Sequence, residues 1–109
     1  SSDISAKGRQ EYQELATTYS WANDHIQARL ASLAAAKLFV EGLRKAGRDL
    51  SRVRLVEGLE SLYGFETGVT PRLSYGPNRR IGARGAHIVE VDLANDTYTP
   101  VGDGWFDVE

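Results

Sequence analysis

Residues 24–47, DHIQARLASLAAAKLFVEGLRKAG, are the stretch of sequence that decides the fold. Asn23 and Asp24 carry short acceptor side chains that suit a helix N-cap. Gly47 supplies the residue that tolerates a positive φ just past a helix end. The stretch therefore predicts one long helix with both of its ends marked.

The interior of this predicted helix is apolar on most sides. Only Ser32 and Lys37 are polar between residues 30 and 40. A helix with so little polar surface needs neighbours on at least two sides. Its apolar run is shorter than the roughly 20 residues that cross a bilayer. The pattern predicts a buried core helix and not a membrane anchor.

Composition limits the classes of protein to which the chain can belong. Its 109 residues are 41% hydrophobic and 26% charged, which is ordinary for one globular domain or part of one. A formal net charge of −2 gives no overall attraction to nucleic acid. The absence of cysteine excludes disulfide and thiolate chemistry. Methionine is also absent, even at position 1, so we expect a processed or trimmed fragment of a longer protein.

Two further helices are expected, one before the long helix in the sequence and one after it. Asp3 or Ser5 can cap the first, whose apolar stripe recurs at helical spacing and consists of Tyr12, Leu15, Ala16 and Tyr19. Trp21 and Ala22 leave only a brief link, so the first two helices should touch as a hairpin. Ser51 can cap the third helix, and Gly64 can end it in the left-handed conformation. The apolar face of the third helix consists of Leu55, Val56, Leu59, Leu62 and Tyr63.

Glycine and proline become frequent after residue 66, and the expected structure changes to short strands. Residues 69–75 fit an edge strand that tolerates Pro71, and residues 76–78, GPN, fit a turn. Residues 86–93, AHIVEVDL, alternate, with Val89, Val91 and Leu93 facing one way. Residues 98–101 can return as a short partner before a glycine-rich tail. The sequence predicts an α/β protein in which three helices precede two or three short strands. So apolar a helix normally lies on a wider sheet, which again indicates a fragment.

No self-sufficient catalytic motif is present. The two histidines, His25 and His87, lie far apart and outside any metal-ligand spacing. The sequence contains no nucleophile elbow, P-loop or dinucleotide fingerprint. We therefore predict no enzyme, no catalytic residue, no bound metal and no cofactor.

Four arginines, Arg72, Arg79, Arg80 and Arg84, gather in a short glycine-rich segment. They could bind a phosphate or carboxylate if their side chains converge, and Tyr75 among them could stack on a base. The alternative is that each pairs with a nearby acidic residue. Because the protein is acidic overall, we predict no nucleic-acid partner.

Residues 34–92 resemble the C-terminal part of type I periplasmic substrate-binding proteins of the leucine/isoleucine/valine-binding family. An alanine-rich helix ends near Gly47, and the strand that follows the glycine-rich segment contains IVEV at residues 88–91. Between them, the positions that fit the family's pattern are Thr67, Gly68, Pro71, Tyr75, Pro77, Arg80 and Gly82. The resemblance covers more than half of the chain.

The resemblance implies a two-lobed protein much longer than this chain, whose lobes close around a ligand by bending at a hinge. It places the last hinge crossing near residues 81–86. Residues 1–85 would then be a helical part of the N-terminal lobe with its edge strand and hinge crossing. Residues 86–109 would be a strand segment of the C-terminal lobe.

The resemblance further implies an extracytoplasmic, periplasmic component of an ABC importer that binds an amino-acid-like or organic-acid solute and meets a membrane permease. Ligand contacts from this region come mainly from the start of the long helix. His25 and Gln27 are the candidates for polar ligand contacts, and Leu33 stands where the family commonly has tyrosine.

Two alternatives stay open. The chain could be a stand-alone interaction module that forms a homo-oligomer through unpaired strands. It could also be a ligand-sensing domain of the same fold used in signalling.

Overall fold

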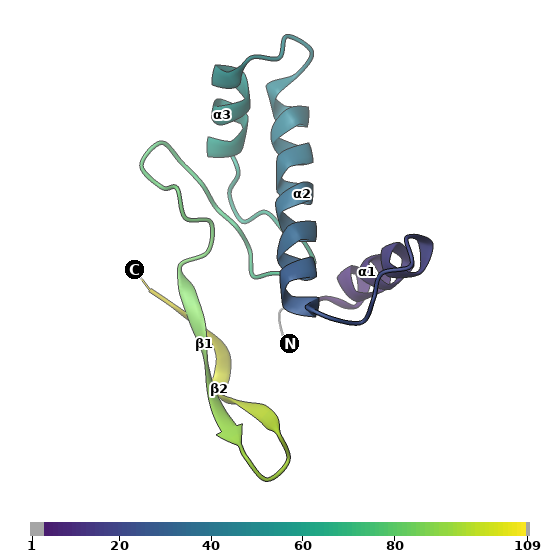
Figure 1. Ribbon diagram of the computed structural model, residues 1–109. Helices are drawn as coiled ribbons and strands as arrows, with labels where there is room; N and C mark the ends of the chain where they lie inside the picture. Colours follow the sequence, from purple (N-terminus) through teal and green to yellow (C-terminus); the bar gives the residue numbers. More distant parts are fainter. Residues whose placement is uncertain (1–3, 109) are drawn as a thin grey trace.

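A computed structural model describes residues 4–108, apart from the side chain of Asp103. Three helices precede two strands, as predicted, so the chain belongs to a mixed helix and strand class. The elements are α1 (Ala6–Thr18), α2 (Ile26–Ala46), α3 (Arg52–Glu60), β1 (Gly85–Asp92) and β2 (Thr97–Asp107). In Figure 1, α2 and α3 lie side by side, α1 lies apart from them, and the two strands form a twisted ribbon that extends away. We call the part of the chain before the ribbon the helical body.

The C-terminal end of α2 agrees with the prediction, and the N-terminal end does not. Gly47 ends the helix with φ of 77°, as predicted. The predicted N-cap is wrong, because His25 precedes the first helical residue in a left-handed conformation and no side chain caps α2. Asp24 does not cap because its carboxylate forms an ion pair with Arg29.

One face of α2 is buried as predicted, and another face, which was also predicted to be buried, is exposed. A stripe along the helix is buried and consists of Leu30, Ala34, Gly42 and Ala46. Leu30 and Ala34 form the core with Val69, and Ile4, Tyr12 and Leu33 pack against it. The expectation of a helix buried on most sides is nevertheless wrong, since Phe39 is 51% exposed and Val40 is also exposed. No described element covers this face.

Two glycines bring α2 and α3 together. A Cβ atom at Gly58 would lie 2.8 Å from the carbonyl oxygen of Gly42, so the two backbones are in contact. Ser51 caps α3 as predicted, since its hydroxyl accepts from the amide of Arg54 at 3.1 Å. The helix ends at Glu60, earlier than predicted, and Tyr63 beyond it is 92% exposed. Gly64 takes the predicted positive φ.

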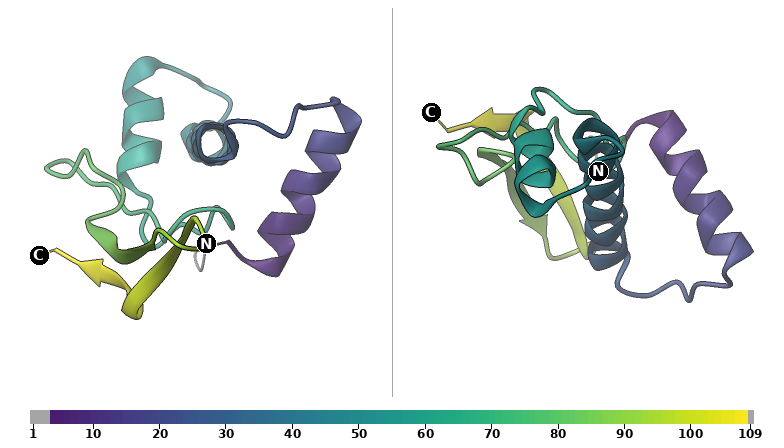
Figure 2. Two further views of the ribbon diagram at one scale, coloured as in Figure 1. Left: turned by 60° about the horizontal axis from the view of Figure 1, so that its bottom comes forward. Right: turned by 90° about the horizontal axis from the view of Figure 1, so that it is seen from above.

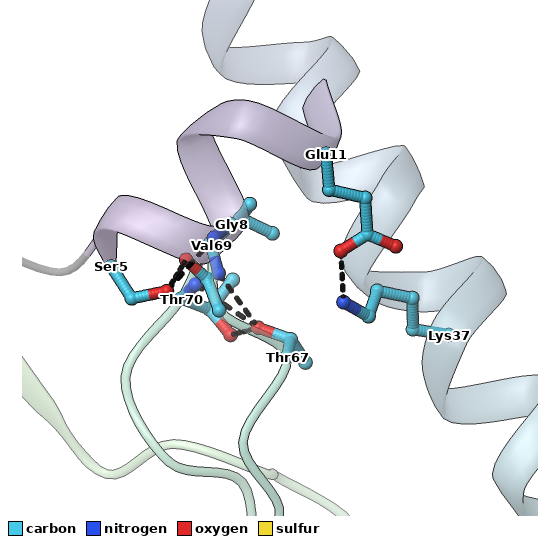
Figure 3. Close-up of polar contacts among 8 residues, drawn as sticks. Ser5, Gly8, Glu11, Lys37, Thr67, Val69 and Thr70 are labelled. Carbon is cyan, nitrogen blue, oxygen red and sulfur yellow. Dashed lines mark hydrogen bonds and ion pairs between the residues drawn. The ribbon is translucent and has the colours of Figure 1, made fainter. Parts of the chain in front are cut away.

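α1 joins the rest of the body through its first turn. Ser5 is its N-cap, and the Ser5 hydroxyl accepts from the amide of Gly8 at 2.9 Å. The amide of Ser5 donates to the carbonyl oxygen of Gly68 at 2.9 Å. The predicted contact with α2 is made by side chains, including an ion pair of 2.5 Å between Glu11 and Lys37 (Figure 3). The helix itself stands apart from the α2 and α3 pair (Figure 2).

Thr67 organises the loop that receives α1. Its side chain is fully buried, and its hydroxyl accepts from the amides of Val69 and Thr70 at 3.3 and 3.1 Å (Figure 3). This threonine turn contradicts the predicted edge strand over residues 69–75, because it bends the backbone. Only an isolated antiparallel bridge between Phe65 and Leu73 remains. The predicted turn at residues 76–78 is confirmed by a bridge between Gly76 and Arg79.

β1 and β2 pair antiparallel in a two-stranded sheet. β1 begins one residue before the predicted strand, whereas β2 extends well beyond the predicted residues 98–101 and includes the glycine-rich tail. The tail can pair because a bulge leaves residues 101–104 opposite Ile88 alone. Gly102 and Gly104 accommodate the bulge with φ of 73° and 108°.

Candidate functional site

The two predicted ligand residues lie at the start of α2, on the surface. His25 is exposed, and its carbonyl oxygen accepts from the amide of Arg29 at 3.1 Å. Gln27 is exposed in the first helical turn. Neither side chain lines the groove described next, and their role as ligand contacts stays a prediction.

An apolar groove of about 440 Å³ lies between α1 and α2, beside these two residues. Its lining residues are Leu15, Trp21, Ala28, Arg29, Ser32, Leu33 and Ala36. The groove exists because α1 touches the loop at Gly68 and then diverges from α2. Its walls are aromatic, aliphatic and cationic, and its lining includes Ala28, the residue after Gln27.

Trp21 is the centre of an aromatic cluster at one end of the groove. Its ring lies 5.8 Å from that of Tyr12 and 6.4 Å from that of Tyr19, measured between centroids. The guanidinium of Arg29 lies 5.9 Å from the centroid of Trp21, which is within cation–π range. Arg29 also donates from Nε to the Asp24 carbonyl oxygen at 2.9 Å and forms an ion pair with the Asp24 carboxylate.

This arrangement limits what the groove can bind. The Asp24 carboxylate already neutralises the Arg29 guanidinium and holds it in place. Arg29 therefore attracts an added anion only weakly. An apolar or aromatic group could pack on the Trp21 ring and the aliphatic wall. Sequence reasoning treated Trp21 as a linker residue and missed the cluster. The three aromatic residues at positions 12, 19 and 21 were the available signal.

The four arginines do not assemble an anion site. Arg72 pairs with Glu66 at 2.6 Å, and Arg80 pairs with Glu60 at 2.5 Å. Arg79 donates to backbone carbonyl oxygens of its own loop. The prediction that arginines of this segment pair with nearby acidic residues is therefore confirmed for Arg72 and Arg80.

The other candidate groups have local roles. His87 is half-buried, as expected for a packing histidine, and meets the ring of Trp105 edge-on at 5.3 Å between centroids. Within residues 4–108 no three metal-ligating side chains come together. No helix in that part of the chain is both long and apolar enough to cross a membrane.

The Asp92 carboxyl lies in the turn between β1 and β2, and its neighbours change its acidity. The pKa of its carboxyl is lowered, first by the side-chain amide of Asn95 and then by the backbone amides of Asn95 and Ala94. These donors lie 2.7 to 3.2 Å from the carboxylate oxygens. The carboxylate thus holds the turn between β1 and β2, and no feature of it points to a ligand.

Comparison of the chain with protein-family models, with curated proteins and with solved structures finds no significant match in any of the three.

Proposed function

We propose that this chain is the C-terminal part of an extracytoplasmic solute-binding protein of an ABC importer, which binds a small amino-acid-like or organic-acid solute without transforming it. The observation that carries the proposal is the separation of the helical body from the ribbon. Only Ala83 and Arg84 lie between buried Gly82 and the first residue of β1. The family resemblance expects the last hinge crossing over residues 81–86.

The exposed apolar side chains support a larger protein around this chain. Phe39 on α2, Tyr63 after α3 and Leu93 in the ribbon turn are all exposed, Leu93 to 90%. Scattered apolar residues are normal on a surface, but the proposal expects these to be covered by the rest of a two-lobed protein. We assign residues 1–85 to one lobe and residues 86–109 to the other.

In this proposal the groove beside α2 receives the apolar part of the solute. Trp21 and Leu33 supply apolar surface. His25 and Gln27 precede the lining residue Ala28 in the sequence, and the proposal assigns them the polar groups of the solute. The charged groups of the solute would be bound by segments outside this chain, because Arg29 is already paired with Asp24.

The test uses the gene product that carries this sequence. Its intact mass is measured, and its thermal unfolding is followed with a panel of amino acids and organic acids. A two-lobed product that one solute class stabilises is expected, because a ligand that binds only the folded state raises the unfolding temperature. A product of about this chain's length would overturn the proposal. A product joined to a signalling domain would favour the ligand-sensing alternative.

A second candidate is a self-associating module, and the ribbon favours it. Val89 lies opposite Pro100, and Val91 lies opposite Tyr98, so these four side chains share one face. The opposite face carries Glu90, Asp92, Thr97 and Thr99. An exposed apolar face on a two-stranded ribbon is a surface that a second copy could cover.

Matched substitutions on the two faces test this candidate by sedimentation of the purified chain. Val91→Lys places a charge on the apolar face and should abolish association. Thr99→Lys places the same charge on the polar face, opposite Glu90, and should preserve association. A chain that stays monomeric at all concentrations would remove this candidate.

A further inference from the structure

The loop between α3 and β1 contains a small hydrogen-bonded unit, residues 73–82. The amide of Ser74 donates to the carbonyl oxygen of Gly82 at 3.0 Å, which closes the unit. Gly76 and Arg79 exchange two backbone hydrogen bonds of 3.1 and 3.0 Å at its tip. We call this unit the bracket.

The side chain of Arg79 crosses the bracket. Its Nε donates to the carbonyl oxygen of Ile81 at 3.1 Å, and its Nη2 donates to that of Gly82, also at 3.1 Å. One planar guanidinium thus holds two successive peptide groups, a geometry that the single ammonium of lysine does not reproduce. Hydrogen bonds with a charged donor are stronger than neutral ones.

Tyr75 packs against the same end of the bracket. A Cβ atom built on Gly82 would lie 2.5 Å from the Tyr75 hydroxyl oxygen, so the phenol ring occupies the space that any side chain at position 82 would need. Gly82 is buried as a result. Two side chains therefore fix Gly82, the last residue of the bracket. Arg79 donates to the carbonyl oxygen of Gly82, and the Tyr75 ring packs against its α-carbon.

The bracket is also attached to the helical body. The amide of Tyr75 donates to the carbonyl oxygen of Leu62 at 2.9 Å, and the amide of Gly64 donates to the Ser74 hydroxyl at 2.7 Å. Phe65 and Leu73 exchange backbone hydrogen bonds of 2.8 and 2.9 Å. Up to Gly82, the loop is thus tied to the C-terminal end of α3.

The ribbon begins almost immediately afterwards. The carbonyl oxygen of Arg84 already accepts from the amide of Val108 at 2.9 Å, so Arg84 belongs to the ribbon. Ala83 alone separates the bracket from the ribbon.

We propose that Arg79 is a positioning residue that makes the bracket rigid, so that the ribbon changes direction relative to the helices only at Ala83. The inference rests on hydrogen bonds within this chain and does not depend on the proposed function. It assigns a role to Arg79, whose guanidinium donates to two backbone carbonyl oxygens of its own loop.

Limited trypsin digestion of the chain tests the inference, because Arg80 lies inside the bracket and Arg84 lies beyond the joint. In the unmodified chain, cleavage after Arg84 should precede cleavage after Arg80. In the Arg79→Lys chain, which keeps a trypsin site at position 79, cleavage after Arg80 should rise about tenfold, because lysine cannot span both carbonyl oxygens. The Arg79→Gln chain loses both charge-assisted hydrogen bonds and should show the same rise after correction for the competing site that it lacks at position 79.

Arg72→Gln is the matched control, since it removes the same charge and an ion pair to Glu66 outside the bracket. It should leave cleavage after Arg80 unchanged. Hydrogen exchange on the same proteins should show faster exchange at Ser74 and Gly76 in the Arg79→Gln chain and unchanged exchange in α2. Equal cleavage after Arg80 with and without Arg79, or faster exchange throughout α2, would overturn the inference.

Discussion

The helical body and the ribbon are held together in different ways. In the body, small residues allow backbones to touch: Gly8 meets Gly68, and Gly42 meets Gly58. The ribbon has more large apolar side chains per residue, yet Val91 and Tyr98 remain exposed. Apolar content alone therefore does not bury a segment. Burial requires a surface of matching shape within reach.

The ribbon accordingly depends on its own ladder and on Trp105. The Trp105 indole donates to the Asp107 carboxylate at 2.8 Å and its ring contacts His87. A two-stranded ribbon without further cover is marginally stable in water. We expect it to open independently of the helices, and the predictions below test that separation.

The largest effect is expected at the joint between α1 and the loop. In Gly8→Ala, the new Cβ would lie 2.0 Å from the Gly68 carbonyl oxygen. Unfolding in urea should show a loss of about 1–3 kcal/mol from overpacking, although alanine favours a helix. Gly76→Ala is the control, because no heavy atom lies within 4 Å of its added Cβ. Equal stability of the two variants would contradict the close contact.

A substitution at the base of the ribbon should separate the two regions. In Gly85→Ala, the Cβ would lie 2.4 Å from the Phe106 carbonyl oxygen and from the Trp105 ring. The cost of this crowding, about 1–3 kcal/mol, falls on the ribbon. The indole NMR signal of Trp105 should shift while that of Trp21 in the body stays in place. A change in both signals would show that the regions are coupled.

Loss of the α3 cap should have an intermediate effect on the body alone. Ser51→Ala removes the hydroxyl that accepts from Arg54 and should cost about 1 kcal/mol in urea unfolding. Ser51→Thr retains the acceptor and should recover most of that loss. If the alanine variant is as stable as the unmodified chain, α3 is held by its glycine contact with α2 and its cap contributes nothing.

The smallest effect is expected at the ribbon turn and depends on pH. The folded pKa of Asp92 is lowered by Asn95, so its contribution to stability is present above the ordinary value of 3.8 and is lost as the pH falls through the lowered folded pKa. NMR titration should find the Asp92 midpoint below 3.8. Asn95→Ala should return it toward that value. An unchanged midpoint in that variant would show that the backbone amides are sufficient.

Much of the fold could be predicted because its signals are local. Ser5 and Ser51 cap their helices, and Gly47 takes a positive φ, each through bonds within a few residues. The failed predictions depended on distant or competing partners. Asp24 does not cap α2 because Arg29 takes its carboxylate, and residues 69–75 do not form a strand because Thr67 bends the chain.

The groove depends on tertiary structure more than the helices and strands do. The sequence pointed to His25 and Gln27 at the start of α2. The groove is instead lined by Leu15 of α1, by Trp21, and by residues 28–36 of α2. A groove between helices depends on the angle at which they diverge. That angle is set at the contact of Gly8 with Gly68, which are distant in sequence.

By itself the sequence determined that three helices precede the strands, that serines cap α1 and α3 and that Gly47 ends α2, because caps, glycine conformations and alternation act over a few residues. Only the tertiary structure decided which apolar faces are buried. The stripe of Leu30 and Ala34 is buried because Val69 reaches it, whereas Phe39 is equally apolar and stays exposed. The difference has a physical reason: burial is a property of two surfaces that meet, and the sequence pattern of one helix describes only one of them.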